Sequence, residues 1–163
     1  ASGRQWGAQA SFLVACLNLR EQYTDWLLAR MLPYGNVVAF EQPYMDASRL
    51  HPVLRARREF GLGKEPVEWY TPDELPEWLP IKPEQLLVGA YVRADGEVLV
   101  TIGNPTDTPL AARMDMGVVS AKLGGPTTVT DAMTGVPCPP IGKQMVLAVP
   151  ANSFRMVTIR AQR

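Results

Sequence analysis

Two carboxylates and a tyrosine follow a short apolar run in the first half of the sequence. The run spans residues 37–40, Glu41 comes directly after it, and Tyr44 and Asp46 follow in a predicted loop. A carboxylate can bind or polarise a hydroxyl group, and a tyrosine ring can stack against a ring-shaped ligand. These three residues are the candidate ligand-binding residues. The alternative for Glu41 is structural, because a carboxylate in this place can cap the next helix or pair with an arginine.

Other chemistry-bearing groups are too few or too widely spaced to form a site. His51 is the only histidine, so a catalytic triad or a histidine-rich metal site has no second member. It precedes Pro52 at a predicted helix start, where we expect it to cap the helix or face solvent. Two cysteines and one histidine cannot form the usual structural zinc sites. Asp107, Asp115 and Asp131 match no EF-hand spacing. The sequence therefore predicts no metal and no cofactor.

The composition is that of a globular protein without a charge bias. The 163 residues are 47% hydrophobic and 20% charged, and 16 basic residues balance 16 acidic ones. Such a chain lacks the broad positive field that nucleic-acid binding usually needs. The longest nearly apolar run, residues 12–17, is far shorter than the roughly 20 residues of a membrane span. We expect neither nucleic acid nor a membrane as a partner.

The first part of the chain is predicted to form a helix, a strand and a second helix. Apolar residues recur in steps of three and four between residues 12 and 31, which indicates one long amphipathic helix. Residues 36–41 are typical of a strand buried on both faces, as in a parallel sheet. In the second helix, Pro52 fits only the first turn, and Gly61 or Gly63 ends the helix.

A lone strand between two helices is an incomplete structure. Both of its edges expose backbone donors and acceptors, which other strands must cover. We therefore expect a partner that completes the sheet, either the N-terminal remainder of the same protein or another chain.

Three arginines lie close together on the second predicted helix, at Arg55, Arg57 and Arg58. Such a cluster can attract an anion. We expect instead that it forms a solvated helix face, which is the usual place for charged side chains.

Residues 62–85 combine five prolines with aromatic residues, and we expect an extended strap that lies between the two halves. The prolines should prevent both a helix and a strand ladder. Trp69, Tyr70 and Trp78 are expected to anchor the strap to the two halves, with a ligand platform as the alternative.

The last part of the chain alternates between strand and turn signals. The predicted strands are residues 86–93, 97–103, 110–116, 127–131, 145–149 and 154–160. This pattern indicates an antiparallel β-sandwich. The predicted fold class is α+β. Its three parts are residues 1–61, a helix-strand-helix segment, residues 62–85, a proline- and tryptophan-rich strap, and residues 86–163, the sandwich.

Three phrases in the sandwich resemble the domain that follows the catalytic barrel in many glycosidases. They are the hairpin from Leu87 to Asn104, the turn Thr130-Asp131-Ala132-Met133-Thr134-Gly135, and the closing strand pair at residues 149–155. Together they cover residues 86–160. The sequence is most similar to the C-terminal part of glycoside-hydrolase-like proteins related to glycoside hydrolase family 123.

The resemblance implies that residues 12–61 are the last helix-strand-helix of a (β/α)8 barrel, with about six barrel strands absent from the sequence. Glu41, Tyr44 and Asp46 would then lie at the C-terminal end of a barrel strand, where barrel active sites are found. Glu41 would bind or polarise a sugar hydroxyl, and Tyr44 would stack on a sugar ring. The catalytic carboxyl pair would come from the absent strands, so no catalytic residue is assigned. The compartment stays open, and the resemblance favours an extracellular or periplasmic location.

Two functions are compatible with this sequence. In the first, the chain is the C-terminal segment of a carbohydrate-active protein, whose sandwich braces a catalytic barrel and is not catalytic alone. Glycoside hydrolysis would then require the missing barrel strands from the rest of the protein or from a partner chain. The alternative is a non-enzymatic β-sandwich module for glycan binding or for assembly on a surface or in a particle. Only Tyr91 and Phe154 are aromatic in residues 86–163, so a sugar-stacking face is poorly supplied.

Overall fold

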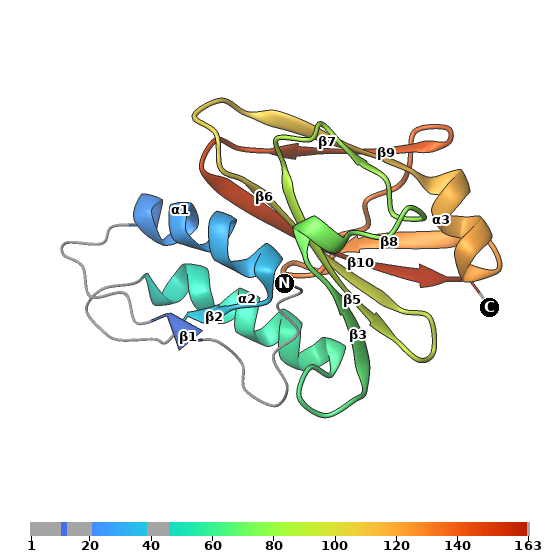
Figure 1. Ribbon diagram of the computed structural model, residues 1–163, viewed down its shortest axis with the longest axis horizontal. Coiled ribbons are helices and arrows are strands. Elements are labelled where there is room, and N and C mark those ends of the chain that lie inside the picture. Colours follow the sequence, from blue (N-terminus) through green and yellow to red (C-terminus); the bar gives the residue numbers. More distant parts are fainter. Residues whose placement is uncertain (1–10, 13–20, 39–45, 163) are drawn as a thin grey trace.

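The computed structural model describes residues 11–12, 21–38 and 46–162, which form helices and strands in three layers (Figure 1). The helices are α1 (Glu21–Met31), α2 (Ala47–Phe60) and α3 (Met116–Leu123), with 3-10 turns η1 (Leu32–Tyr34) and η2 (Pro72–Glu74). The strands are β1 (Ser11–Phe12), β2 (Val37–Val38), β3 (Val67–Tyr70), β4 (Ile81–Lys82), β5 (Leu87–Arg93), β6 (Val98–Asn104), β7 (Leu110–Asp115), β8 (Thr127–Asp131), β9 (Gln144–Val149) and β10 (Ser153–Ala161).

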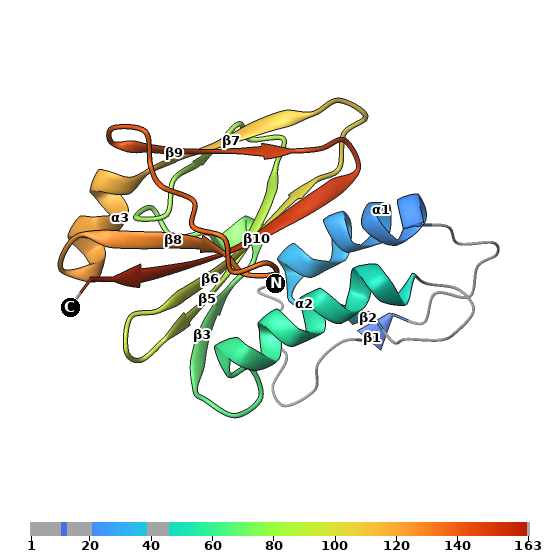
Figure 2. The same ribbon diagram turned by 180° about the vertical axis from the view of Figure 1, so that it is seen from behind.

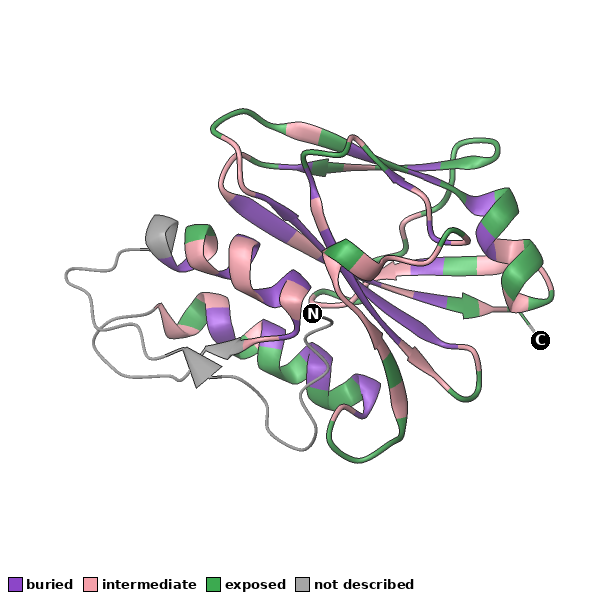
Figure 3. Ribbon diagram, in the orientation of Figure 1, coloured by how far each residue is buried: buried purple, intermediate pink, exposed green. Residues whose placement is uncertain are grey.

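Two antiparallel sheets form the predicted sandwich. The larger sheet has the strand order β3-β5-β6-β10-β8, and the smaller one has the order β4-β7-β9. All six predicted sandwich strands are present within one or two residues of their expected bounds. In β6, Val98, Val100 and Ile102 pack into the core between the sheets, while Leu99 belongs to a second core on the other face. The central sheet is therefore buried on both faces (Figure 3).

The second core lies between the five-stranded sheet and the two N-terminal helices (Figure 2). Leu28 and Leu32 from α1 and η1 contribute to it, together with Leu50 and Phe60 from α2. The sheet side of this core is formed by Tyr91, Leu99, Phe154 and Met156. The helical layer is thus fixed to the sandwich by a continuous apolar interface.

Two glycines bring the helical backbone unusually close to this sheet. A Cβ placed on Gly103 would lie 1.8 Å from the carbonyl oxygen of Ala29, and one on Gly89 would lie 1.9 Å from that of Pro33. No side chain fits either gap. Gly103 and Gly89 therefore allow α1 and η1 to pack against bare strand backbone.

The first helix was predicted to span residues 12 to 31, and the prediction of its start is wrong. Ser11 and Phe12 form β1, which pairs in parallel with Val37 and Val38 of β2, and the described part of the helix begins at Glu21. Short apolar runs occur in buried strands as well as in helices, so periodicity alone did not separate the two.

The prediction of a parallel strand at residues 37–38 is confirmed. The idea that this strand stands alone is wrong, because β1 covers one of its edges. The (β/α)8 barrel remnant stays a prediction.

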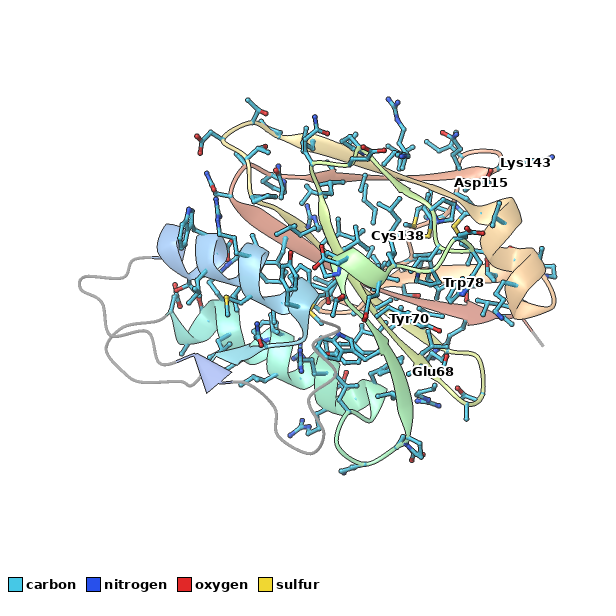
Figure 4. The ribbon with its side chains drawn as sticks, viewed as in Figure 1. Glu68, Tyr70, Trp78, Asp115, Cys138 and Lys143 are labelled. Atoms are coloured by element: carbon cyan, nitrogen blue, oxygen red, sulfur yellow. The ribbon has the colours of Figure 1, made fainter. Side chains whose placement is uncertain are left out.

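The strap was expected to contain no ladder, and that expectation is wrong. β3 pairs with β5 in the larger sheet, and β4 pairs with β7 in the smaller one. The prolines lie outside these short strands, so they end the ladders without preventing them. The expected anchoring is present. Trp69 packs against the helical core. Tyr70 and Trp78, which are labelled in Figure 4, pack against the core between the sheets.

Helix α2 differs from the prediction in two respects. Asp46 is its N-cap, so Pro52 lies in the second turn, inside the helix, and not in the first turn as expected. Gly61 ends it in the left-handed conformation, as predicted. The arginine cluster does not form one solvated face, because Arg57 is buried while Arg55 and Arg58 are exposed. Helix α3 was also missed, and it begins at the N-cap Asp115.

Candidate functional site

The two N-terminal helices begin at the same edge of the small parallel sheet. Each follows a parallel strand in the chain, so their first turns lie toward the C-terminal ends of β1 and β2. The backbone N–H of Asp46 donates a 2.9 Å hydrogen bond to Oγ1 of Thr24, which joins the start of α2 to α1. In barrel enzymes generally, active sites lie at the C-terminal ends of the parallel strands.

Of the three predicted ligand-binding residues, the structure describes one. Glu41 and Tyr44 lie outside the described residues, and their roles stay predictions. Asp46 is at the edge just defined, where its Oδ1 accepts 2.8 and 2.6 Å hydrogen bonds from the backbone N–H and the hydroxyl of Ser48. These hydrogen bonds lower the pKa of the Asp46 carboxyl below its ordinary value, so it is ionised at neutral pH. The structure thus shows Asp46 as the cap of α2, and its role in ligand binding stays a prediction.

A cleft of about 630 Å³ separates this part of the helical layer from the sandwich loops. Its polar lining residues are Asp25, Arg49, Asp131, Thr134, Asn152, Ser153 and Arg155. A second hollow of about 390 Å³ adjoins it, because Arg49, Met133 and Phe154 line both. The cleft therefore lies where α1 and α2 meet the loops at one end of the sandwich.

A polar network crosses the cleft from the helices to β10. Arg49 binds Asp25 with two hydrogen bonds, of 2.8 and 2.5 Å, and Ser153 donates a 3.0 Å bond from Oγ to the same carboxylate. Nearby, Arg55 donates a 2.8 Å bond to the carbonyl oxygen of Met133. These contacts connect α1, α2 and the sandwich. Because each of these charged side chains is bound by a fixed protein partner, the network stabilises the interface between the layers.

Sequence reasoning missed Asp25, Arg49 and Ser153. Asp25 and Arg49 have the positions of ordinary polar residues on helix surfaces, and Ser153 that of a turn residue. The contact between Asp25 and Ser153 joins residues 128 positions apart in the sequence. No local pattern marks such a pair. His51, by contrast, is exposed on α2, as the sequence led us to expect.

The three family-like phrases form well-satisfied turns. Asp131 accepts bonds at Oδ1 from the backbone N–H groups of Met133 and Thr134, which is an Asx turn. Asn104 is fully buried and donates from Nδ2 to the carbonyl oxygens of Thr108, Val149 and Pro150. Asn152 has a φ of 49° and accepts a 3.0 Å bond from Arg30. These residues hold the loops that line the cleft.

The described residues contain no group of three or more histidine, cysteine or acidic side chains placed to hold a metal ion. Within the same residues, no helix has the length and apolar character needed to cross a membrane. The carboxylates of the cleft accept hydrogen bonds from fixed protein groups. The arrangement is therefore better suited to holding the two layers together than to acid-base chemistry.

Comparison with solved structures relates this fold to sugar-processing enzymes. No family model matches the chain, and no curated protein matches it in sequence. A protein from Bacillus halodurans assigned as an alpha-N-acetylgalactosaminidase superposes with a TM-score of 0.57 at 12% identity, over 87% of this chain and 30% of the other. The fold is glycoside-hydrolase-like.

Two further structures share this glycoside-hydrolase-like fold. A protein from Bacteroides fragilis assigned as an alpha-galactosidase/melibiase matches 89% of this chain and 29% of its own, with 16% identity and a TM-score of 0.52. Alpha-galactosidase I from Mortierella vinacea matches 87% of this chain and 36% of its own, with 10% identity and a TM-score of 0.52. The chain thus spans about a third of the length of these structures. At these identities the likeness concerns the fold alone.

Proposed function

We propose that this chain is the C-terminal segment of a carbohydrate-active, glycoside-hydrolase-like protein. In this proposal the sandwich braces a catalytic barrel and has no catalytic activity alone. The observation that carries the proposal is the fold, which extends over almost nine-tenths of the chain and about a third of the compared enzymes. A relation to glycoside hydrolase family 123 is the finer form of the proposal.

The packing of the helical layer supports a bracing role. The backbones of α1 and η1 lie directly against Gly103 and Gly89 of the central sheet, and the network of Asp25, Arg49 and Ser153 closes one end of the interface. Because the helical layer is packed tightly against the sandwich, any strand joined to that layer is also held in a fixed position relative to the sandwich.

The small parallel sheet supports the idea of a missing part. β1 and β2 form a sheet of only two short strands, and β2 has no second neighbour among the described strands. Parallel sheets normally bury several strands between layers of helices. In the proposed protein, further parallel strands extend this sheet into the barrel. Glu41, Tyr44 and Asp46 then contact the sugar, and the catalytic carboxyl pair comes from the added strands.

The test is reconstitution of activity with nitrophenyl glycosides as substrates. We expect the isolated chain to be inactive and to cleave them when combined with the polypeptide that supplies the other strands. Glu41→Gln should then lower cleavage at least tenfold, whereas Glu59→Gln, the same change at an exposed position of α2, should leave it unchanged. A well-formed complex that cleaves no glycoside would contradict the proposal.

The non-enzymatic alternative has one observation in its favour. Val118, Val136, Ile141 and Val146 are exposed on the sandwich, with Ile141 at 78%. Exposed aliphatic side chains favour assembly with another protein surface. They do not favour glycan binding by residues 86–163, because the two aromatic residues of that range, Tyr91 and Phe154, are both buried in the helical core. The bracing function and the assembly function both predict no hits on a glycan array. Hits would favour glycan binding by the sandwich.

A further inference from the structure

Arg57 carries a buried positive charge that has no acidic partner among the residues the structure describes. Its side chain lies on the inner face of α2, and the residue is 7% exposed. No carboxylate of residues 46–162 or 21–38 forms an ion pair with it, although five other ion pairs occur in this part of the chain. Its one hydrogen bond to a backbone acceptor is a long 3.5 Å contact with the carbonyl oxygen of Gly35.

The groups around this guanidinium are also hydrogen-bond donors. Arg57 lies over the ring of Tyr91 at 5.4 Å, and Tyr91 stacks on Trp69 with ring centroids 6.4 Å apart. The indole Nε1 of Trp69 is buried and has no hydrogen-bond partner. All three side chains meet at Gly35, since a Cβ there would lie 2.7 Å from Cε2 of Trp69 and 2.9 Å from the hydroxyl of Tyr91.

A cluster of this kind is incomplete by itself. An arginine, an indole and a phenol all have protons to donate, and each buried donor without an acceptor destabilises the fold. A buried charge without a counter-charge is more unfavourable still. A carboxylate satisfies both requirements, because it is acceptor-only and negatively charged, and it can bind a guanidinium with two parallel bonds.

We propose that Arg57, Trp69 and Tyr91 form an anchor for an aspartate or glutamate of the polypeptide that extends the parallel sheet. The inference rests on the proposed function, which supplies that polypeptide. The place of the cluster supports it. Gly35 lies two residues before β2, and the far edge of β2 has no neighbour among the described strands. A strand added to that edge brings its first side chains beside Gly35.

The anchor lies at the opposite end of β2 from Asp46. The C-terminal edge of the sheet leads to the candidate sugar-contacting residues, and the N-terminal edge begins at Gly35. In barrels the N-terminal face serves stability and the C-terminal face serves chemistry. The proposed acid is therefore an assembly contact and not a catalytic group.

Unfolding of the isolated chain is the first test. Arg57→Met keeps most of the side-chain volume and removes the charge, and Arg58→Met makes the same change at an exposed position of the same helix. We expect the urea midpoint of Arg57→Met to equal or exceed that of the wild type, because an unpaired buried charge has been removed. A clearly lower midpoint than that of Arg58→Met would show that Arg57 is satisfied within the chain and would overturn the proposal.

Binding to the added polypeptide is the second test, measured by calorimetry. We expect Arg57→Met to weaken association at least tenfold, and Arg58→Met to change it by less than twofold. Equal affinity of the two variants would overturn the anchor while leaving the proposed function standing. A complex with the expected affinities but no glycoside cleavage would support the anchor and contradict the proposed function. If the wild-type chain does not associate at all, both the partner and the anchor are refuted.

Discussion

Replacing Gly103 with alanine should lift α1 from the central sheet. The added Cβ would lie 1.8 Å from the carbonyl oxygen of Ala29, whereas real Cβ atoms essentially never come within 3.0 Å of another heavy atom. The helix must retreat by roughly 1 Å, a gap that removes about a quarter to a half of the dispersion energy across the interface. Leu28 and Leu32 are almost completely buried there, and each contributes about 2–3 kcal/mol by burial. The expected loss in the free energy of unfolding is about 1–3 kcal/mol.

Urea denaturation followed by tryptophan fluorescence measures this loss. Gly125→Ala is the control, because a Cβ at Gly125 meets no atom within 4 Å, and its stability should stay within about 0.5 kcal/mol of the wild type. Gly89→Ala displaces the same layer through Pro33, so the double variant should lose less than the sum of the single losses. Equal stability of Gly103→Ala and Gly125→Ala would refute the reasoning, since the close approach would then have no energetic consequence.

Three further substitutions test the site and its loops by urea unfolding. Asn104→Asp places a carboxylate against carbonyl oxygens and should destabilise by about 2–3 kcal/mol at pH 7; burial raises its folded pKa, so the deficit should shrink as the pH falls. The contribution of Asp46 to stability has the opposite pH dependence, because hydrogen bonds from Ser48 lower the pKa of its carboxyl in the folded state. Its capping contribution should be complete above its ordinary pKa of 3.8 and fade as the pH falls below it, while Asp46→Asn should lack this pH dependence. Asp25→Asn should lose about 1–2 kcal/mol through its contact with Arg49, and equal stability would show that the network adds nothing.

The sandwich was predictable because its signals are local. The alternation of side chains in residues 98–102 indicates a strand. Gly96 marks the turn before this strand, and Asn104 marks its end. The same rule failed for β3 and β4, which are short and lie between prolines. Their pairing depends on β5 and β7, which are distant in the sequence. Tertiary context decided these segments, and local pattern did not.

The candidate site was less predictable, because its contacts join separate parts of the chain. Asp46 was correctly placed between strand and helix, and its capping of α2 follows from local chemistry. The pairing of Asp25 with Arg49 and Ser153 has no local signal. Arg57 illustrates the same limit, since helical spacing places it beside exposed Arg58, and only the packed structure shows that it points inward.

The helical layer and the sandwich depend on each other, which bears on the choice between the two functions. An autonomous sandwich module needs a central sheet with one face in the core and one face in water. Here Leu99, Met156 and Phe154 are buried on the second face of that sheet, against α1 and α2. Without the helices, this face would be a large apolar surface exposed to solvent. The helices are therefore an integral layer of the fold. This dependence fits the proposed bracing segment better than an autonomous sandwich module, because the layer that carries β1 and β2 also completes the sandwich.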